Sequence, residues 1–182
     1  MLKYALLGFL NYGSMTGYQL KQFMDDSTCN FWNAKISQIY TTLKSLEETE
    51  MVTSRIQPQE ERPDKRVYTI TEKGRSDFQQ WLAEPETHVP QLKDGFLLKF
   101  FFSSRLDKET ILSQLRLQKK LHQRQADFYR TETRSMLKRI LEQNPVTQKD
   151  ATLWEAARRA GEIFEEAYVN WLNETIQMVE EK

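Results

Sequence analysis

The sequence has few of the residues on which catalytic and metal sites depend. Its 182 residues include one cysteine, Cys29, and two histidines, His88 and His122, which lie far apart in the chain. One cysteine excludes an internal disulfide framework and a thiolate metal cluster, and neither a glycine-rich phosphate loop nor a nucleophile elbow is present. We therefore predict that the protein is not an enzyme, holds no metal or cofactor, and uses its histidines for surface or packing roles.

The chain also lacks net charge and long apolar runs. Lys+Arg and Asp+Glu both number 26, so no bulk charge attracts the protein to nucleic acid, although this does not exclude a local basic face. The apolar opening, MLKYALLGFL, is too short and interrupted for a membrane span, and no signal-cleavage pattern follows it. An aromatic content of 12% indicates a packed protein. We predict a soluble, cytoplasmic protein with no membrane segment.

Helical and strand patterns follow one another in the first half of the chain. Short amphipathic segments predict three helices, the second capped by Thr16. Alternating, β-branched segments then predict two strands around a charged loop that contains prolines. The order predicts a winged helix-turn-helix domain over residues 1–84. Its predicted elements are helices over residues 2–10, 16–26, 34–48 and 71–83 and strands over residues 51–56 and 66–70.

The helix predicted over residues 34–48 has a polar outer face and carries no acidic residue before Glu47. Its inner stripe is formed by Ile36, Ile39, Leu43 and Leu46, and its outer face by Ser37, Gln38, Thr41 and Lys44. Side chains that enter a major groove are polar and carry no negative charge that phosphates would repel. Gln38 suits an adenine edge and the Thr41 methyl group suits thymine. This face is therefore predicted to read DNA sequence.

Basic side chains near this helix are expected to contact the DNA backbone. They are Lys35, Lys44 and the residues Arg62, Lys65 and Arg66 of the wing over 57–66. Backbone amides beside Thr16 suit a further phosphate. The region 1–84 nevertheless holds ten Lys+Arg and eleven Asp+Glu, a net charge of −1, so its basic residues must gather on one side. Because Ser/Thr faces also occur at protein contacts, a protein-interaction module that does not bind DNA is the alternative.

The second half of the chain is predicted to be a helical dimerisation domain. A linker over residues 85–93 contains two prolines, and residues 94–182 show helical patterns only. One long helix over 107–143 has a sparse apolar seam that continues through Met136 and Ile140, and a last helix covers about 150–180. Both are expected to pair in an antiparallel arrangement and with a second copy. The expected dimerisation residues are Leu153, Trp154, Ala157, Ala160, Phe164, Tyr168 and Trp171.

Three stretches resemble the PadR-type winged-helix transcriptional regulators. They are LLGFLNYGSMTGYQL, FWNAKISQIYTTLKSLEETEMV and KRVYTITEKGRSDFQQWL, in family order over residues 6–82. PQEERPDKRVY and DGFLLKFFF are most similar to the branch that contains the virulence activator AphA. The resemblance implies a mainly α (α+β) fold with long C-terminal helices, and a homodimeric regulator that binds double-stranded DNA at a two-fold related operator.

The resemblance also implies roles for single residues. It places Tyr18 and Tyr40 near the DNA backbone, although Tyr40 lies beside the core stripe and packing is its alternative role. Family members usually carry glycine where this chain has Glu50, so a strained backbone or a different turn is expected there. Some members sense small molecules, and the C-terminal aromatic residues are an alternative lining for a small apolar or phenolic effector.

Overall fold

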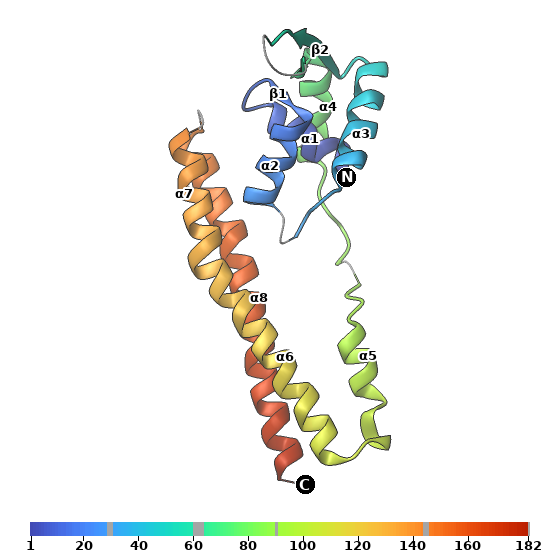
Figure 1. Cartoon of the computed structure of the whole chain (residues 1–182), viewed down its shortest axis with the longest axis vertical. Coiled ribbons are helices and arrows are strands. Elements are labelled where there is room, and N and C mark those ends of the chain that lie inside the picture. The colour runs from blue at the N-terminus through green and yellow to red at the C-terminus, as the bar shows by residue number, and fades with distance from the viewer. Residues whose placement is uncertain (29–30, 60–63, 90, 144–145, 182) are drawn as a thin grey trace. The chain divides into compact units, whose positions relative to one another are not determined.

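The computed structural model describes residues 1–28, 31–59, 64–89, 91–143 and 146–181 (Figure 1). The chain forms two compact units, residues 1–87 with 139–147 and residues 88–138 with 148–182. The fold is mainly helical with one small sheet, which confirms the predicted fold class. Among the described helices, none offers an apolar stretch that would cross a membrane. The division into residues 1–84, 85–93 and 94–182 stays a prediction.

The first unit contains a winged helix-turn-helix. Its sheet has the order β1-β3-β2 and is antiparallel, with Val52 opposite Ile70 at one end of the β2–β3 hairpin and Gln57 opposite Lys65 at the other. The two-residue strand β1 was not predicted, because a pair of residues shows no alternation. The elements are α1 (Leu2–Leu10), β1 (Met15–Thr16), α2 (Gly17–Ser27), α3 (Ile36–Glu48), β2 (Val52–Gln57), β3 (Lys65–Ile70) and α4 (Glu72–Ala83).

The core of this unit joins the three N-terminal helices to the sheet. Ile39, Leu43 and Leu46 of α3 are buried, as the helical period predicts. Ile36 is 40% exposed, so the prediction that it belongs to the inner stripe was wrong; it is the first residue of the helix and lies at the edge of the core. The buried cluster is formed by Leu6, Leu7, Phe9, Leu10, Met15, Leu20, Met24, Ile39, Leu43, Leu46, Val52, Tyr68 and Ile70.

Glu50 ends α3 in a conformation that usually requires glycine. Its φ is 59°, within the left-handed region. The backbone N–H of Glu50 donates to the Glu47 carbonyl at 3.0 Å, and that of Met51 donates to the Leu46 carbonyl at 2.8 Å. These two bonds form a Schellman cap, in which the left-handed position is occupied here by a residue with a side chain. The strain expected at Glu50 is therefore present.

Replacing this residue with glycine is expected to stabilise the first unit. Glu50→Gly removes the left-handed penalty and should raise the free energy of unfolding by about 1 kcal/mol, measured by urea denaturation. Glu50→Ala is the matched control, because it also removes the exposed ion pair to Lys73 but retains the strain. Equal stability of the two variants would mean that the backbone conformation is not the source of the effect.

The second unit is built on a long antiparallel pair of helices, α6 and α8 (Figure 1). Helix α5 packs on α8 through Phe96 and Phe100, whose rings meet Trp171 edge-on at 6.4 and 6.0 Å. His122 of α6 stacks on Tyr168 of α8, with ring centroids 3.9 Å apart. The elements, including the helix that continues into the first unit, are α5 (Gly95–Phe101), a 3-10 turn (Ser103–Arg105), α6 (Lys108–Phe128), a π-helical turn (Tyr129–Thr133), α7 (Arg134–Gln143) and α8 (Gln148–Glu180).

The π-helical turn interrupts the helix that was predicted to run without a break from 107 to 143. A π turn adds one residue to a helical turn and shifts the apolar seam that follows it. Beyond the turn, Ile140 is buried as predicted and Met136 is half-buried. Leu137 is also buried, which the unbroken helical period did not predict.

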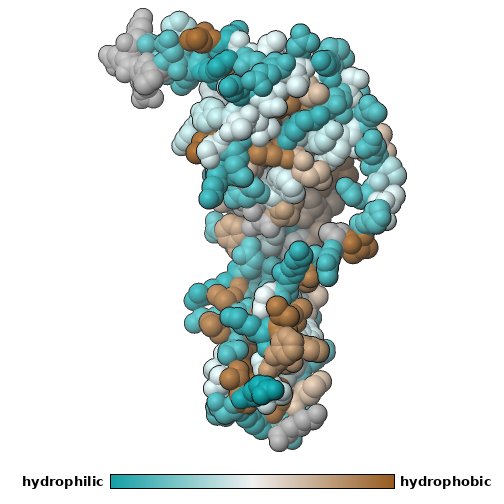
Figure 2. All heavy atoms as spheres, turned by 90° about the vertical axis from the view of Figure 1, so that its right-hand side faces the viewer, coloured by the Kyte–Doolittle hydropathy of each residue, from teal (hydrophilic) through white to brown (hydrophobic). Residues whose placement is uncertain are grey.

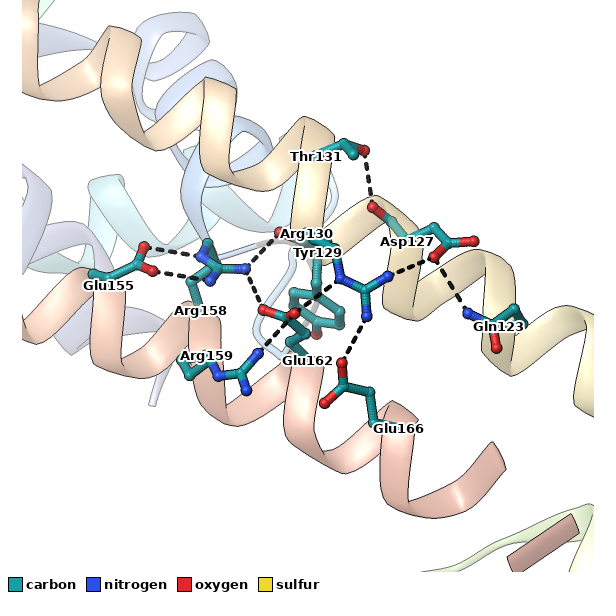
Figure 3. A network of polar contacts seen from close by, with 10 residues as sticks. All are labelled: Gln123, Asp127, Tyr129, Arg130, Thr131, Glu155, Arg158, Arg159, Glu162 and Glu166. Atoms are coloured by element: carbon teal, nitrogen blue, oxygen red, sulfur yellow. Dashed lines mark hydrogen bonds and ion pairs between the residues drawn. The ribbon is translucent and has the colours of Figure 1, made fainter. Parts of the chain in front are cut away.

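A buried charge cluster faces the π turn (Figure 3). Arg158 donates from Nη1 to the Tyr129 carbonyl at 2.7 Å and to Glu162 Oε2 at 2.9 Å. Its other nitrogens pair with both carboxylate oxygens of Glu155. Glu162 Oε1 also pairs with Arg159 Nη1 at 2.7 Å and with Arg130 Nε at 3.2 Å. The guanidinium of Arg158 thus binds a carbonyl of the irregular turn and anchors α8 to it.

Gly161 allows the Tyr129 ring to pack directly against α8. A Cβ atom at residue 161 would lie 2.4 Å from Tyr129 Cζ and 2.7 Å from its hydroxyl oxygen, closer than non-bonded atoms approach. The tyrosine is 6% exposed, so the ring has little room to move away. Glycine at this position therefore permits the close contact between the two helices.

Candidate nucleic-acid interface

The outer face of α3 is exposed over its whole length. Ser37, Gln38, Thr41 and Lys44 all lie on the surface, opposite the buried Ile39 and Leu43. The Thr41 hydroxyl donates to the Ser37 carbonyl at 3.0 Å, which is the usual arrangement of a threonine within a helix. This bond fixes the rotamer and turns the methyl group away from the backbone carbonyl. The residues predicted to read DNA therefore form one polar surface.

Gln38 also caps the start of α3. Its Oε1 accepts a hydrogen bond from the backbone N–H of Lys35 at 2.9 Å, and Lys35 is the residue before the first helical turn. A bidentate contact to adenine uses both the oxygen and the amide N–H of a glutamine. Gln38 would therefore have to leave the cap to make that contact, exchanging one hydrogen bond for two.

The beginning of α2 lies against Tyr40. A Cβ atom at Gly17 would be 2.6 Å from Tyr40 Cε1, so the tyrosine ring packs directly on the first residue of α2. Tyr40 is still 47% exposed and Tyr18 is 70% exposed. Tyr40 can therefore pack on Gly17 and still present part of its ring to the DNA backbone. Sequence alone did not indicate the contact with Gly17.

Thr16 forms a capping box at the same helix start. Its hydroxyl accepts from the Gln19 N–H at 3.1 Å, and Gln19 Oε1 accepts from the Thr16 N–H at 2.9 Å. The predicted N-cap role of Thr16 is confirmed by this geometry. Capping holds the α2 terminus in place, with its positive dipole end next to the two exposed tyrosines.

Two of the three basic wing residues lie in the described part of the hairpin. Lys65 and Arg66 are exposed at the start of β3, whereas Arg62 lies outside the described residues. Arg66 is engaged within the protein: its Nη2 donates to Glu47 Oε2 at 2.7 Å and its Nε donates to Ser54 Oγ at 2.7 Å. We call Glu47, Ser54 and Arg66 the wing clasp.

The wing clasp closes on itself. The Ser54 hydroxyl donates to Glu47 Oε1 at 2.6 Å, so each of the three side chains bonds to both others. The hydrogen bond from Ser54, together with the Arg66 guanidinium, lowers the pKa of Glu47 below its ordinary value and keeps the carboxylate ionised. Sequence analysis missed Glu47 and Ser54, because no local pattern links residues on α3, β2 and β3.

Comparisons with known proteins agree with this geometry. Residues 6–80 match the transcriptional regulator PadR-like family, and residues 92–180 match the family described as the C-terminal part of virulence activator alpha. Residues 6–80 thus belong to the PadR-like family. Its members are transcriptional regulators, which confirms the prediction that the protein is not an enzyme.

Two relatives show how far the PadR-like match extends. The negative transcriptional regulator PadR of Bacillus subtilis is 36% identical over 109 residues, 60% of this chain and 60% of that protein. The structure of B. subtilis PadR with operator DNA has a TM-score of 0.85 at 27% identity and covers 98% of both chains. The Vibrio cholerae virulence activator AphA has a TM-score of 0.72 at 25% identity and covers 99% of this chain and 98% of its own.

The residues expected at the dimer contact of this PadR-like protein fall into two groups. One group is exposed along one face of α8: Leu153, Ala157, Ala160 and Phe164. The other group is partly buried within the same chain: Trp154, Tyr168 and Trp171. Tyr168 donates to Asp94 Oδ2 at 2.6 Å, while Trp171 packs against α5. The first group therefore leaves apolar surface exposed, whereas the second group packs largely within its own chain.

Proposed function

We propose that this PadR-like protein is a cytoplasmic, sequence-specific DNA-binding regulator that acts as a homodimer on a two-fold related operator. The supporting observation is the exposed polar face of α3, which carries no acidic residue before Glu47, together with the exposed Tyr18 and Lys65. The relative from B. subtilis, similar over the whole length of this chain, has been solved with operator DNA. Helix α3 would enter the major groove and the hairpin would lie along the backbone.

The proposal assigns distinct tasks to the two surfaces. Gln38 and Thr41 would read base edges, because they are exposed and lie one helical turn apart on the same face. Ser37 and Lys44 would add contacts at the groove wall. Lys35, Lys65 and Tyr18 would contact phosphates, which position a protein without reading sequence.

Removing a base-reading side chain should lower discrimination between operator and random DNA. Gln38→Ala or Thr41→Ala is expected to cost about 1–3 kcal/mol of operator binding and to leave random-sequence binding nearly unchanged. The operator is first selected from bound genomic fragments, and affinities for both duplexes are then measured by fluorescence anisotropy. Wild-type discrimination in both variants would show that another surface reads the sequence.

Lys65→Ala is the matched control for that experiment. It removes a backbone contact and should weaken operator and random binding equally, with the salt slope reduced by about one. The full salt series also separates DNA binding from the alternative of a protein-interaction module. Binding through several phosphates falls steeply with salt, whereas a module that does not recognise DNA shows no such slope.

The homodimer is supported by unpartnered apolar surface on the second unit. Figure 2 shows apolar side chains gathered on the part of the surface that includes α5. Phe101 is 81% exposed, and other large apolar side chains of this unit are also exposed. Large apolar side chains gathered on one surface mark interaction sites, and a two-fold contact between identical faces would cover them. The exposed apolar side chains of this unit include Leu98, Phe101, Phe102, Leu106, Leu117, Leu121, Leu153, Ile163 and Phe164.

A small apolar or phenolic effector is the second ligand that we propose. B. subtilis PadR has also been solved with p-coumaric acid, in a structure with a TM-score of 0.81 to this chain at 27% identity. The second unit has a groove of about 360 Å³ with Phe96, Leu117 and Lys99 in its lining. An aromatic ring would rest on the two apolar side chains while the ammonium group of Lys99 pairs with a carboxylate.

A further inference from the structure

We propose that the wing clasp holds α3 and the hairpin at the angle at which both reach the duplex, so that Arg66 is a positioning residue and not a phosphate contact. The inference rests on the proposed function, because it treats these two elements as one DNA-binding surface. The clasp joins three elements: Glu47 lies in the last turn of α3, Ser54 in β2 and Arg66 in β3.

The geometry of Arg66 supports a positioning role. Two of its guanidinium nitrogens are used, Nε on Ser54 and Nη2 on Glu47, both at 2.7 Å. The group also lies over the Tyr68 ring, 5.7 Å from the centroid. A planar guanidinium bonded to two side chains of the protein has a fixed orientation, and its charge is balanced by the Glu47 carboxylate that it binds. A DNA phosphate would have to compete with that carboxylate.

The position of Glu47 also supports a positioning role for the clasp. It is an acid close to a proposed DNA-binding surface, where a carboxylate without a partner would repel phosphates. Within the clasp its charge is paired with Arg66 at 2.7 Å, and its other oxygen accepts from Ser54 at 2.6 Å. The clasp therefore accounts for an acidic residue that simple electrostatics would disfavour.

The position of the clasp along the hairpin explains what it restrains. Val52 and Ile70, at the root of the hairpin, pack in the core with Leu46. Ser54 and Arg66 lie farther from that root, outside the buried cluster. A hydrogen bond placed farther from the root of a hairpin restrains rotation of the hairpin about that root more effectively than packing at the root does. The clasp can therefore fix the wing relative to α3 before DNA arrives, which lowers the ordering cost of binding.

Two substitutions distinguish the positioning role of Arg66 from a phosphate contact, because the two roles predict opposite changes in DNA affinity. Glu47→Ala breaks the clasp and should weaken operator binding roughly three- to tenfold. If Arg66 instead contacts phosphate, the same change removes an anion, releases the guanidinium and tightens binding to operator and random duplexes. Arg66→Lys keeps the charge but cannot bond to both partners, so the clasp predicts the same loss and a phosphate contact predicts nearly wild-type binding.

The salt dependence gives an independent readout, measured on the full-length protein. Arg66→Ala should lower operator affinity with an unchanged slope of log affinity against log salt, whereas loss of a phosphate contact reduces the slope by about one. The double variant Glu47→Ala with Arg66→Ala should bind like Arg66→Ala alone, since residues in one network are not additive. Tighter binding of Glu47→Ala, or a reduced slope for Arg66→Ala, would overturn the inference.

The result for Gln38→Ala distinguishes failure of the clasp from failure of the proposed function. If Gln38→Ala and Thr41→Ala both keep wild-type discrimination, α3 does not read the operator and the docking mode is wrong. If they lose discrimination while Glu47→Ala binds more tightly, only the clasp is wrong. Thermal unfolding is followed for each variant, and Arg66→Lys supplies the result if Glu47→Ala does not fold.

Discussion

A fragment of residues 1–84 is expected to bind the operator about 10²–10⁴-fold more weakly than the full chain, although it stays folded. One winged-helix domain with a net charge of −1 can make only a few phosphate contacts. Joining two of them through the second unit makes the second binding event intramolecular, which supplies the additional affinity. The fragment should fold because its buried cluster lies wholly between Leu6 and Ile70.

Sedimentation and footprinting test this expectation directly. The fragment should sediment as a monomer with a cooperative unfolding transition, and the full chain should sediment as a dimer. Protection of DNA by the full chain should be two-fold symmetric, with half-sites about one helical turn or a multiple apart. A full-length monomer that binds a single isolated half-site tightly would contradict the homodimer model.

Arg158→Ala is expected to lower the free energy of unfolding of the second unit by about 3–5 kcal/mol. Arg158 is 6% exposed and Glu162 is 3% exposed, so the ion pair is shielded from water. The substitution removes the donor to the Tyr129 carbonyl and the bidentate contact with Glu155. Loss of one donor to a buried carbonyl and of one cation beside the buried Glu162 carboxylate both destabilise the folded state. Urea denaturation of the full chain measures the loss.

Arg159→Ala provides the matched control, because Arg159 is half exposed and pairs with the same carboxylate. Its loss should cost less than about 1 kcal/mol. Arg158→Met combined with Glu162→Leu should be less destabilised than Arg158→Ala, since no buried charge is left without its partner. Equal losses in Arg158→Ala and Arg159→Ala would show that burial does not govern the cluster.

Acid should weaken the same cluster. Hydrogen bonds from Arg159 and Arg158 lower the pKa of Glu162 to about 2, compared with 4.5 in the unfolded chain. A carboxylate with a lowered pKa contributes stability that is complete above pH 4.5 and is lost as the pH falls toward 2. The difference in stability between the native protein and Arg158→Ala should therefore narrow over that interval.

Sequence reasoning located the elements that have a strong period. The helix over residues 2–10 matched α1 in full, and α3 was placed within two residues at its start. It failed at the π-helical turn, where Arg158, a residue of another helix, binds the Tyr129 carbonyl. A local period carries no information about such a partner.

Part of the candidate interface could be predicted from the sequence and part could not. The exposed face of α3 follows directly from its buried stripe, because the two lie on opposite sides of one helix. The wing clasp was not predictable, since Glu47 and Arg66 are 19 residues apart and meet only when the hairpin folds back on α3. Charge and spacing therefore suggested a phosphate contact for Arg66, and the network suggests a different role.

The contact between Tyr129 and Gly161 limits how α6 and α8 can slide along one another. Moving α6 by one turn in either direction would place the tyrosine ring opposite residue 157 or 165, which are Ala157 and Glu165. Both carry a Cβ atom in the space that the ring occupies at Gly161. The absence of a methyl group at residue 161 thus favours one register of the helical pair, the same register in which Arg158 reaches the Tyr129 carbonyl.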